Sequence, residues 1–75
     1  MTVRSAAEQL AALRHAAAPY PALAKKLTGV VLSNAHRACT QLEQFARAAS
    51  KEPGGAVGAV LAAGARRIEA VLGSC

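Results

Sequence analysis

Residues 51–72 read KEPGGAVGAVLAAGARRIEAVL and contain both the strongest loop signal and the most apolar helical segment of the chain. Pro53 followed by two glycines ends one helix and permits the positive backbone angles of a tight loop. From about residue 56 to residue 72 apolar residues recur at helical spacing, and Gly73 supplies a stop. This stretch predicts two antiparallel helices that meet at the loop.

A shorter helix is predicted near the start of the chain. Ser5 and Glu8 have the spacing of a capping box, in which the Ser5 hydroxyl accepts a hydrogen bond from the Glu8 backbone N–H. The helix would run over about residues 6–17 and end at the Pro-Tyr-Pro sequence of residues 19–21, because a residue before proline is pushed out of the helical region. Its few large apolar residues favour a strap over the other helices, and a segment that swings away is the functional alternative.

The segment between the Pro-Tyr-Pro sequence and the loop predicts a long helix. Pro21 suits a first helical turn, where its missing N–H is no loss. Apolar residues keep one phase from there to about residue 50, and Gly29 falls on the polar side. We therefore expect one continuous helix over 21–50. A break between Thr28 and Ser33 is the main alternative, because glycine in a helix interior costs about 1 kcal/mol.

Together these segments predict an all-α fold in a single small domain over residues 1–75. The three helices would span about 6–17, 21–50 and 56–72, with the second and third forming an antiparallel hairpin and the first packed across it. The chain has 75 residues, of which 53% are apolar, and half of the apolar residues are alanine. A core with so few large side chains is small, so we expect a partner chain to add apolar contacts.

Charge and composition argue against several classes of protein. Nine Lys and Arg against four acidic residues give a net charge of +5, which favours anionic partners without choosing among nucleic acid, anionic lipid and acidic protein. No apolar run is long enough for a transmembrane helix, and residues 1–13 carry charges where a secretory signal would be apolar, so we expect a cytoplasmic protein. Without an acid/base pair or a cofactor fingerprint, the sequence predicts a non-enzymatic protein that has no catalytic residues and no cofactor.

His36 and Cys39 stand one helical turn apart, a spacing that can supply two ligands to a metal ion. A closed site needs four ligands, and the remaining candidates, His15 and Cys75, lie in separate segments. We therefore interpret His36 and Cys39 as a surface histidine and a half-buried thiol, and we predict no metal site. A disulfide between Cys39 and Cys75 is disfavoured, because a straight hairpin would separate them by about 15 Å.

Asn34 falls in the apolar stripe of the predicted 21–50 helix, where an amide must find a hydrogen-bond partner. One interpretation is an interface position, since a single core asparagine often pairs with its copy across a dimer. The other is a position at the end of a neighbouring helix, or one shifted in phase by Gly29. The sequence leaves both interpretations open.

Basic residues follow the polar face of the second predicted helix and continue onto the third. Such a stripe can track the phosphates of a nucleic acid, and the simpler alternative is a solvated face. No aromatic side chain is interleaved with it, which argues against stacking on single-stranded bases. The candidate anion-binding residues are Lys25, Lys26, Arg37, Arg47, Arg66 and Arg67.

The predicted helix over 56–72 is apolar on both sides. We expect its side with larger residues to face the core; this stripe comprises Val57, Val60, Leu61, Gly64, Ile68, Val71 and Leu72. The other side carries a ridge of small residues that lets another helix approach closely; the ridge is Gly58, Ala62 and Ala65. Since so small a domain has no second layer to cover the ridge, we predict a subunit interface. Its candidate residues are Asn34, Val57, Gly58, Leu61, Ala62 and Ala65.

These features predict a protein–protein interaction or assembly module, which acts as a homo-oligomer or as the small subunit of a complex with another helical protein. A small basic regulator bound to nucleic acid is the alternative. A cationic membrane-active helical peptide comes third, and the absence of tryptophan and the modest lysine content argue against contact with a membrane surface.

Overall fold

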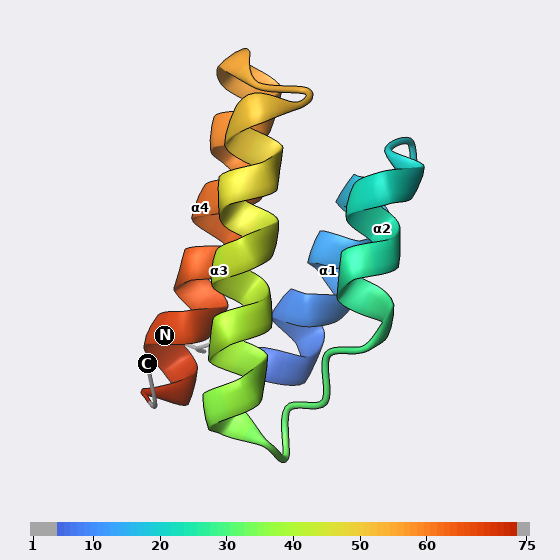
Figure 1. Ribbon diagram of the computed structural model, residues 1–75. Helices are drawn as coiled ribbons and strands as arrows, with labels where there is room; N and C mark the ends of the chain where they lie inside the picture. Colours follow the sequence, from blue (N-terminus) through green and yellow to red (C-terminus); the bar gives the residue numbers. More distant parts are fainter. Residues whose placement is uncertain (1–4, 74–75) are drawn as a thin grey trace.

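The computed structural model describes residues 5–73, and every regular element in that range is an α-helix (Figure 1). The helices are α1 (Ala6–Ala17), α2 (Pro21–Thr28), α3 (Ala35–Lys51) and α4 (Gly55–Leu72). The all-α prediction is confirmed. The predicted count of three helices is wrong, because the segment expected to be one helix over 21–50 forms two. Within residues 5–73, no helix combines the length and apolar character that crossing a membrane requires.

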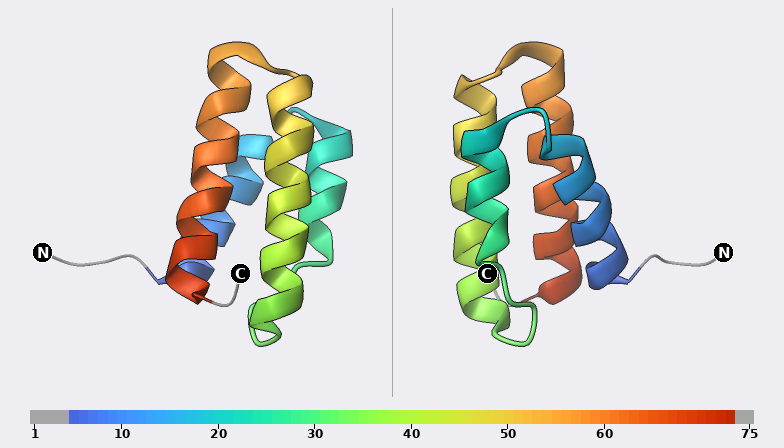
Figure 2. Two further views of the ribbon diagram at one scale, coloured as in Figure 1. Left: turned by 60° about the vertical axis from the view of Figure 1, so that its left-hand side comes forward. Right: turned by 90° about the vertical axis from the view of Figure 1, so that its right-hand side faces the viewer.

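The four helices alternate in direction and lie side by side as two antiparallel hairpins (Figure 2). α3 and α4 form the longer hairpin, and α1 and α2 form a shorter one that packs against it. α4 contacts α3 and α1, and α2 contacts the same two helices. One side of α4 is therefore covered by α3 and a second side is flanked by α1.

The core lies between the two hairpins and receives side chains from all four helices. Its largest fully buried side chains are Phe45, Leu27, Leu42 and Ile68. α1 adds Leu10 and Leu13, which are only 4% and 5% exposed. The short first helix therefore buries both of its leucines, as a helix packed over the others must do to be stable.

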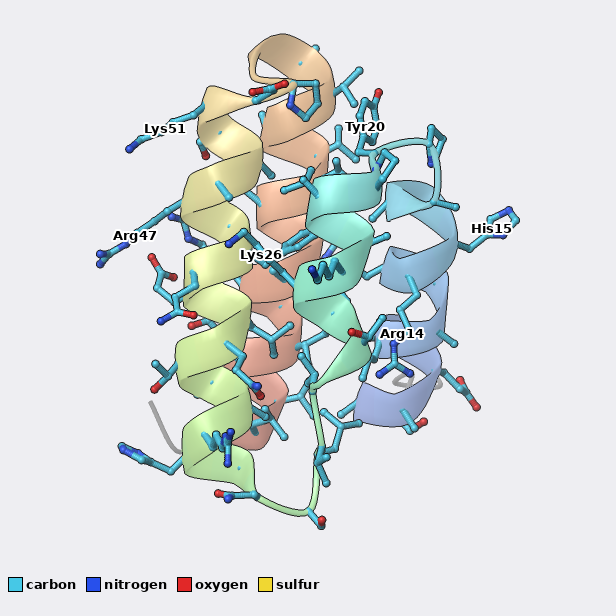
Figure 3. All side chains as sticks on the ribbon, turned by 45° about the vertical axis from the view of Figure 1, so that its right-hand side comes forward. Arg14, His15, Tyr20, Lys26, Arg47 and Lys51 are labelled. Carbon is cyan, nitrogen blue, oxygen red and sulfur yellow. The ribbon has the colours of Figure 1, made fainter. Side chains whose placement is uncertain are left out.

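The segment between α2 and α3 leaves the helical path at Gly29, and contacts from two other helices hold it there. Arg14 Nη2 of α1 donates to the carbonyl oxygens of Leu27, at 3.0 Å, and Val30, at 3.4 Å, and Figure 3 shows Arg14 beside the end of α2. Gln41 Nε2 of α3 donates to the carbonyl oxygen of Gly29 at 3.3 Å. This break corrects the predicted continuous helix: a shared apolar phase does not show that two helical pieces are joined in line.

Side-chain and backbone caps set several helix ends where the sequence indicates them. The Ser5 hydroxyl accepts a hydrogen bond from the Glu8 N–H at 3.2 Å, and Gly73 follows α4 with a φ of 67°. Asn34 is exposed and begins α3, where its Oδ1 accepts from the Arg37 N–H at 3.4 Å. Asn34 therefore occupies an end-of-helix position and does not lie in the apolar stripe of a helix.

Candidate functional site

α4 packs on α3 through the ridge of small residues. The buried residues of α4 are Gly58, Leu61, Ala62, Ala65 and Ile68. A Cβ atom at Gly58 would clash with the carbonyl oxygen of Ala49 in α3, so only glycine fits this contact. The ridge predicted to admit a second subunit is thus occupied by α3 of the same chain. Of the predicted interface residues, only Val57 and Asn34 are exposed.

The predicted stripe of larger residues on α4 lies only partly in the core: Leu61 and Ile68 are buried as expected, and three valines are not. Val57, Val60 and Val71, all expected to face the core, are 48%, 66% and 48% exposed. With Gly64 and Arg67 between them, these residues are spaced alternately by three and four positions, which places them on one helix face at the a and d positions of a heptad. We call Val57, Val60, Gly64, Arg67 and Val71 the α4 seam.

A groove of about 310 Å³ runs between this seam and α1. We call it the α1–α4 groove; it is lined by Gln9, Ala12, Leu13, Ala16, Val60, Leu61, Gly64 and Arg67. A second hollow adjoins it toward the start of α4, and shares Ala16, Val60 and Leu61 while adding Ala56 and Val57. Small alanines on α1 and Gly64 on α4 leave the room that makes this surface concave.

Arg67 is the charged residue of the α1–α4 groove. Its guanidinium makes no ion pair or hydrogen bond with any residue of 5–73. Two other arginines do have partners: Arg66 is bound to a glutamate, and Arg14 to backbone carbonyl oxygens. The groove is therefore an apolar surface with one cation available to a partner.

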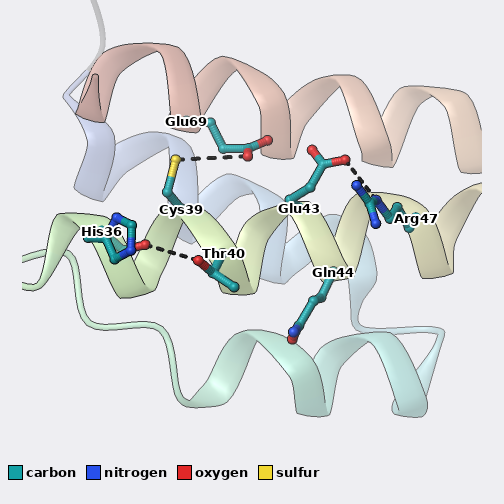
Figure 4. A pocket seen from close by; sticks show the side chains of 7 residues that line it. All are labelled: His36, Cys39, Thr40, Glu43, Gln44, Arg47 and Glu69. Atoms are coloured by element: carbon teal, nitrogen blue, oxygen red, sulfur yellow. Dashed lines mark hydrogen bonds and ion pairs between the residues drawn. The ribbon is translucent and has the colours of Figure 1, made fainter. Parts of the chain in front are cut away.

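A second, polar groove of about 330 Å³ lies between α3 and α4 (Figure 4). Its lining residues are His36, Cys39, Thr40, Glu43, Gln44, Arg47 and Glu69. Glu43 Oε2 accepts from Arg47 Nε at 3.2 Å and from Arg66 Nη2 at 3.5 Å. In this α3–α4 groove, the charge of the Glu43 carboxylate is therefore balanced by two arginines.

The two glutamates of the α3–α4 groove have opposite pKa shifts. Hydrogen bonds from Arg66 and then Arg47 lower the pKa of Glu43, because they favour its ionised form. Burial, and then the neighbouring charge of Glu43, raise the pKa of Glu69. Opposed shifts of this kind also arise in structural ion-pair networks, so they do not by themselves assign a catalytic role.

The structure also corrects the prediction for Cys39, which lines the α3–α4 groove. Cys39 is disulfide-bonded, and the other cysteine of the sequence is Cys75, which lies outside the described residues. The spacing argument against a bridge placed Cys39 about ten residues from the point opposite Cys75, whereas Cys39 Sγ lies 3.9 Å from Glu69 Oε1, close to the end of α4. His36 and Cys39 do line the same groove, but residues 5–73 contain no group of three or more side chains placed to hold a metal ion.

The predicted anion-binding residues lie on several surfaces. Arg47 and Arg66 meet at Glu43, while Lys25 and Lys26 stand on α2. Figure 3 shows Lys26 and Arg47 on their separate helices. Arg37 lines a hollow beside Asn34, and Arg67 lines the α1–α4 groove. The fold thus brings two of the six cations together, on a shared carboxylate.

Comparisons with protein-family models, curated proteins and solved structures give no match, so the surfaces are interpreted from their own chemistry. The sequence does not reveal the α1–α4 groove as a whole, although two of the predicted interface residues, Val57 and Leu61, line it or the adjoining hollow. The alternate spacing of three and four residues does not distinguish the seam, because the buried residues Gly58, Leu61, Ala65 and Ile68 of α4 are spaced in the same way.

Proposed function

We propose that this protein is a non-enzymatic protein–protein interaction module that binds its partner through the α1–α4 groove. The observation that carries the proposal is the α4 seam. Val57, Val60 and Val71 expose about half or more of their side chains along one line of one helix. Isolated exposed apolar residues are ordinary on protein surfaces, but exposed apolar residues that gather beside a groove lined mainly by apolar residues indicate an interaction site.

The energetics support the same proposal. Burying apolar surface contributes roughly 25 cal/mol per Å², so a partner that covers the valines and the alanines beside them gains from every side chain it removes from water. Gly64 adds no side chain of its own, and a Cβ atom there would lie 3.2 Å from Leu13 Cδ1, so α1 already contacts α4 at this point and forms one wall of the groove. In this proposal the protein works in the cytoplasm as the small subunit of an assembly.

The basic residues give less support to the nucleic-acid alternative. A phosphate-tracking surface needs several cations along one path. Arg37, Arg47 and Arg67 line three different hollows, and Arg47 shares Glu43 with Arg66. We therefore propose that the net positive charge helps to select a protein partner.

Site-specific photo-crosslinking in the cells that make the protein tests the proposal. A photoreactive amino acid replaces Val60 in one variant and Val31 in the other. Val31 is a matched control, since it is 58% exposed and lines a different hollow, beside Gly29 and Asn34. We expect a discrete protein adduct, with another copy or another protein, at position 60 and not at position 31. Equal adducts at both positions, none at position 60, or an adduct to nucleic acid would contradict it.

A further inference from the structure

We propose that the occupant of the α1–α4 groove is an amphipathic α-helix of a different protein, which carries a carboxylate side chain opposite Arg67 and further acidic residues on its flanks. This inference rests on the proposed function and specifies the partner's chemistry. Three observations on the described residues support it: the position of the seam beside the groove, the single cation in the groove, and the charge of the chain.

The α4 seam follows one face of α4 beside a groove between two helices, and this arrangement favours a helix as the occupant. Alternation by three and four residues keeps successive side chains facing one neighbouring helix that crosses at a shallow angle. Val57, Gly64 and Val71 hold the a positions, and Val60 and Arg67 the d positions. α1 forms the other wall of the groove, so a docked helix would contact α1 and α4 together. An extended peptide would not follow this register over the length of the seam.

Arg67 selects an acidic residue on that helix. Arg67 lines the groove together with mostly apolar residues, and its guanidinium makes no ion pair with any described residue. A helix that covers the groove with apolar side chains alone would remove this cation from water without a partner, which is costly. A glutamate or aspartate placed opposite Arg67 satisfies the guanidinium with charge-assisted hydrogen bonds.

A second copy of the chain fits these requirements poorly. Each copy carries a net charge of +5, so two copies repel at moderate salt. The seam itself contains no carboxylate, and a seam-to-seam contact would set Arg67 against a second Arg67 or against a valine. A partner with an acidic helix is attracted by the same charges that keep copies apart.

Two synthetic helical peptides serve as probes. Both are about 21 residues long, three heptads, with leucine at a and d; one has glutamate and the other lysine at e and g. The labelled peptide is kept dilute so that it does not pair with itself, and binding is followed by fluorescence anisotropy in moderate salt. We expect the acidic peptide to bind at least about tenfold more tightly than the basic one.

Matched variants locate the binding on the protein. Val60→Asp and Arg67→Glu change the groove, whereas Val31→Asp and Arg37→Glu make the same changes of charge at the hollow between α2 and α3. We expect each groove variant to weaken the acidic peptide by about tenfold or more, and Arg67→Glu to improve the basic peptide. The control variants should stay within about twofold, and circular dichroism confirms that all four are folded.

Three outcomes would overturn this inference. Equal weakening by groove and control variants would mean that the peptide senses only net charge. Failure of both peptides to bind would remove the acidic helix as the occupant. A dimer in sedimentation that Val60→Asp dissociates, with neither peptide bound, would identify the occupant as a second copy. That last result would leave the proposed function intact, whereas the absence of any adduct at position 60 would remove the function itself.

Discussion

The two sides of α4 present different residues: small ones lie against α3, and exposed valines lie on the other side. The side against α3 is made of Gly58, Ala62 and Ala65, and all three are buried. The seam on the side toward α1 and solvent carries Val57 and Val60, which are 48% and 66% exposed. The small residues of the ridge are therefore buried and the valines of the seam exposed, while two large apolar side chains of α4, Leu61 and Ile68, are buried as well.

The difference follows from how closely α3 and α4 approach. The backbone of α4 at Gly58 lies against the carbonyl oxygen of Ala49, and no side chain fits between them. Close-packed helices gain contact along their whole length, and small residues make that possible. The larger side chains of Val57 and Val60 do not enter this contact. They lie exposed on the other face, where a partner can bury them. Substitutions on each side of α4 test this difference.

The largest effect is expected from adding volume at Ala65, which is fully buried. Ala65→Leu forces extra atoms between α3 and α4 and should lower the free energy of unfolding by about 3 kcal/mol. Ala63→Leu makes the same change on the exposed side of α4 and should alter it by less than about 0.5 kcal/mol. Urea denaturation followed by circular dichroism measures both. Comparable losses in the two variants would mean that Ala63 is packed as tightly as Ala65.

A smaller effect is expected from single methyl groups at two glycines of α4. Gly58→Ala places its Cβ on a backbone oxygen that cannot move away, and should cost about 2 kcal/mol of unfolding free energy. Gly64→Ala meets only the end of the Leu13 side chain, at 3.2 Å, and gains up to about 1 kcal/mol of helix propensity. Thermal unfolding should therefore show Gly64→Ala at or above the native stability. If Gly58→Ala matched it, the close approach to α3 would be refuted.

The rim of the α3–α4 groove gives a pH-dependent prediction. The lowered pKa of Glu43 means that its carboxylate stabilises the fold above the ordinary glutamate pKa, and that this contribution is lost as the pH falls through the lowered value. The raised pKa of Glu69 means that the fold favours the protonated acid, so stability is lost as the pH rises from the ordinary glutamate pKa through the raised value.

At about pH 7, Glu43→Gln should therefore be less stable than the native chain and Glu69→Gln more stable. The Glu69→Gln difference should vanish once the pH is below the ordinary glutamate pKa, and the Glu43→Gln difference only at lower pH, below the lowered pKa of Glu43. Unfolding curves across this range test the pair. Parallel curves for the two variants would contradict the opposed shifts.

The smallest effect on stability is expected at the seam. Val60→Asp replaces a side chain that is 66% exposed and contributes little to the core, so the free energy of unfolding should change by less than about 0.5 kcal/mol. A loss of several kcal/mol in thermal denaturation would show that Val60 belongs to the core after all. If the free energy of unfolding is unchanged, any loss of binding by Val60→Asp can be attributed to the docking surface.

Sequence patterns predicted the all-α fold, the cap at Ser5, the loop after Lys51 and the stop at Gly73, because each depends on residues close together in the chain. The break after α2 was one of two alternatives because of Gly29, but residues close together in the chain do not decide between them. It is held by hydrogen bonds from Arg14 and Gln41, which reach it from other helices.

The sequence did not indicate which side of residues 56–72 is exposed, and the reason is a different one. A helical wheel of residues 56–72 carries no information on which side meets α3, and the buried face combines the ridge residues with Leu61 and Ile68 of the predicted stripe. The larger side was assigned to the core because size usually accompanies burial. Steric contact at Gly58 decides the matter, and that contact exists only once α3 is in place.

Methyl NMR of the valines, leucines and isoleucine, recorded as the acidic peptide is added, tests most directly whether the seam is a docking surface. Shift changes are expected at Val57 and Val60 and, to a smaller degree, at Val71, because these side chains are exposed along the groove. Ile68, which is fully buried, should stay unmoved, as should Val31 in its separate hollow. Changes centred on Val31, or no change at Val57 and Val60 in a peptide-bound sample, would contradict a docking surface between α1 and α4.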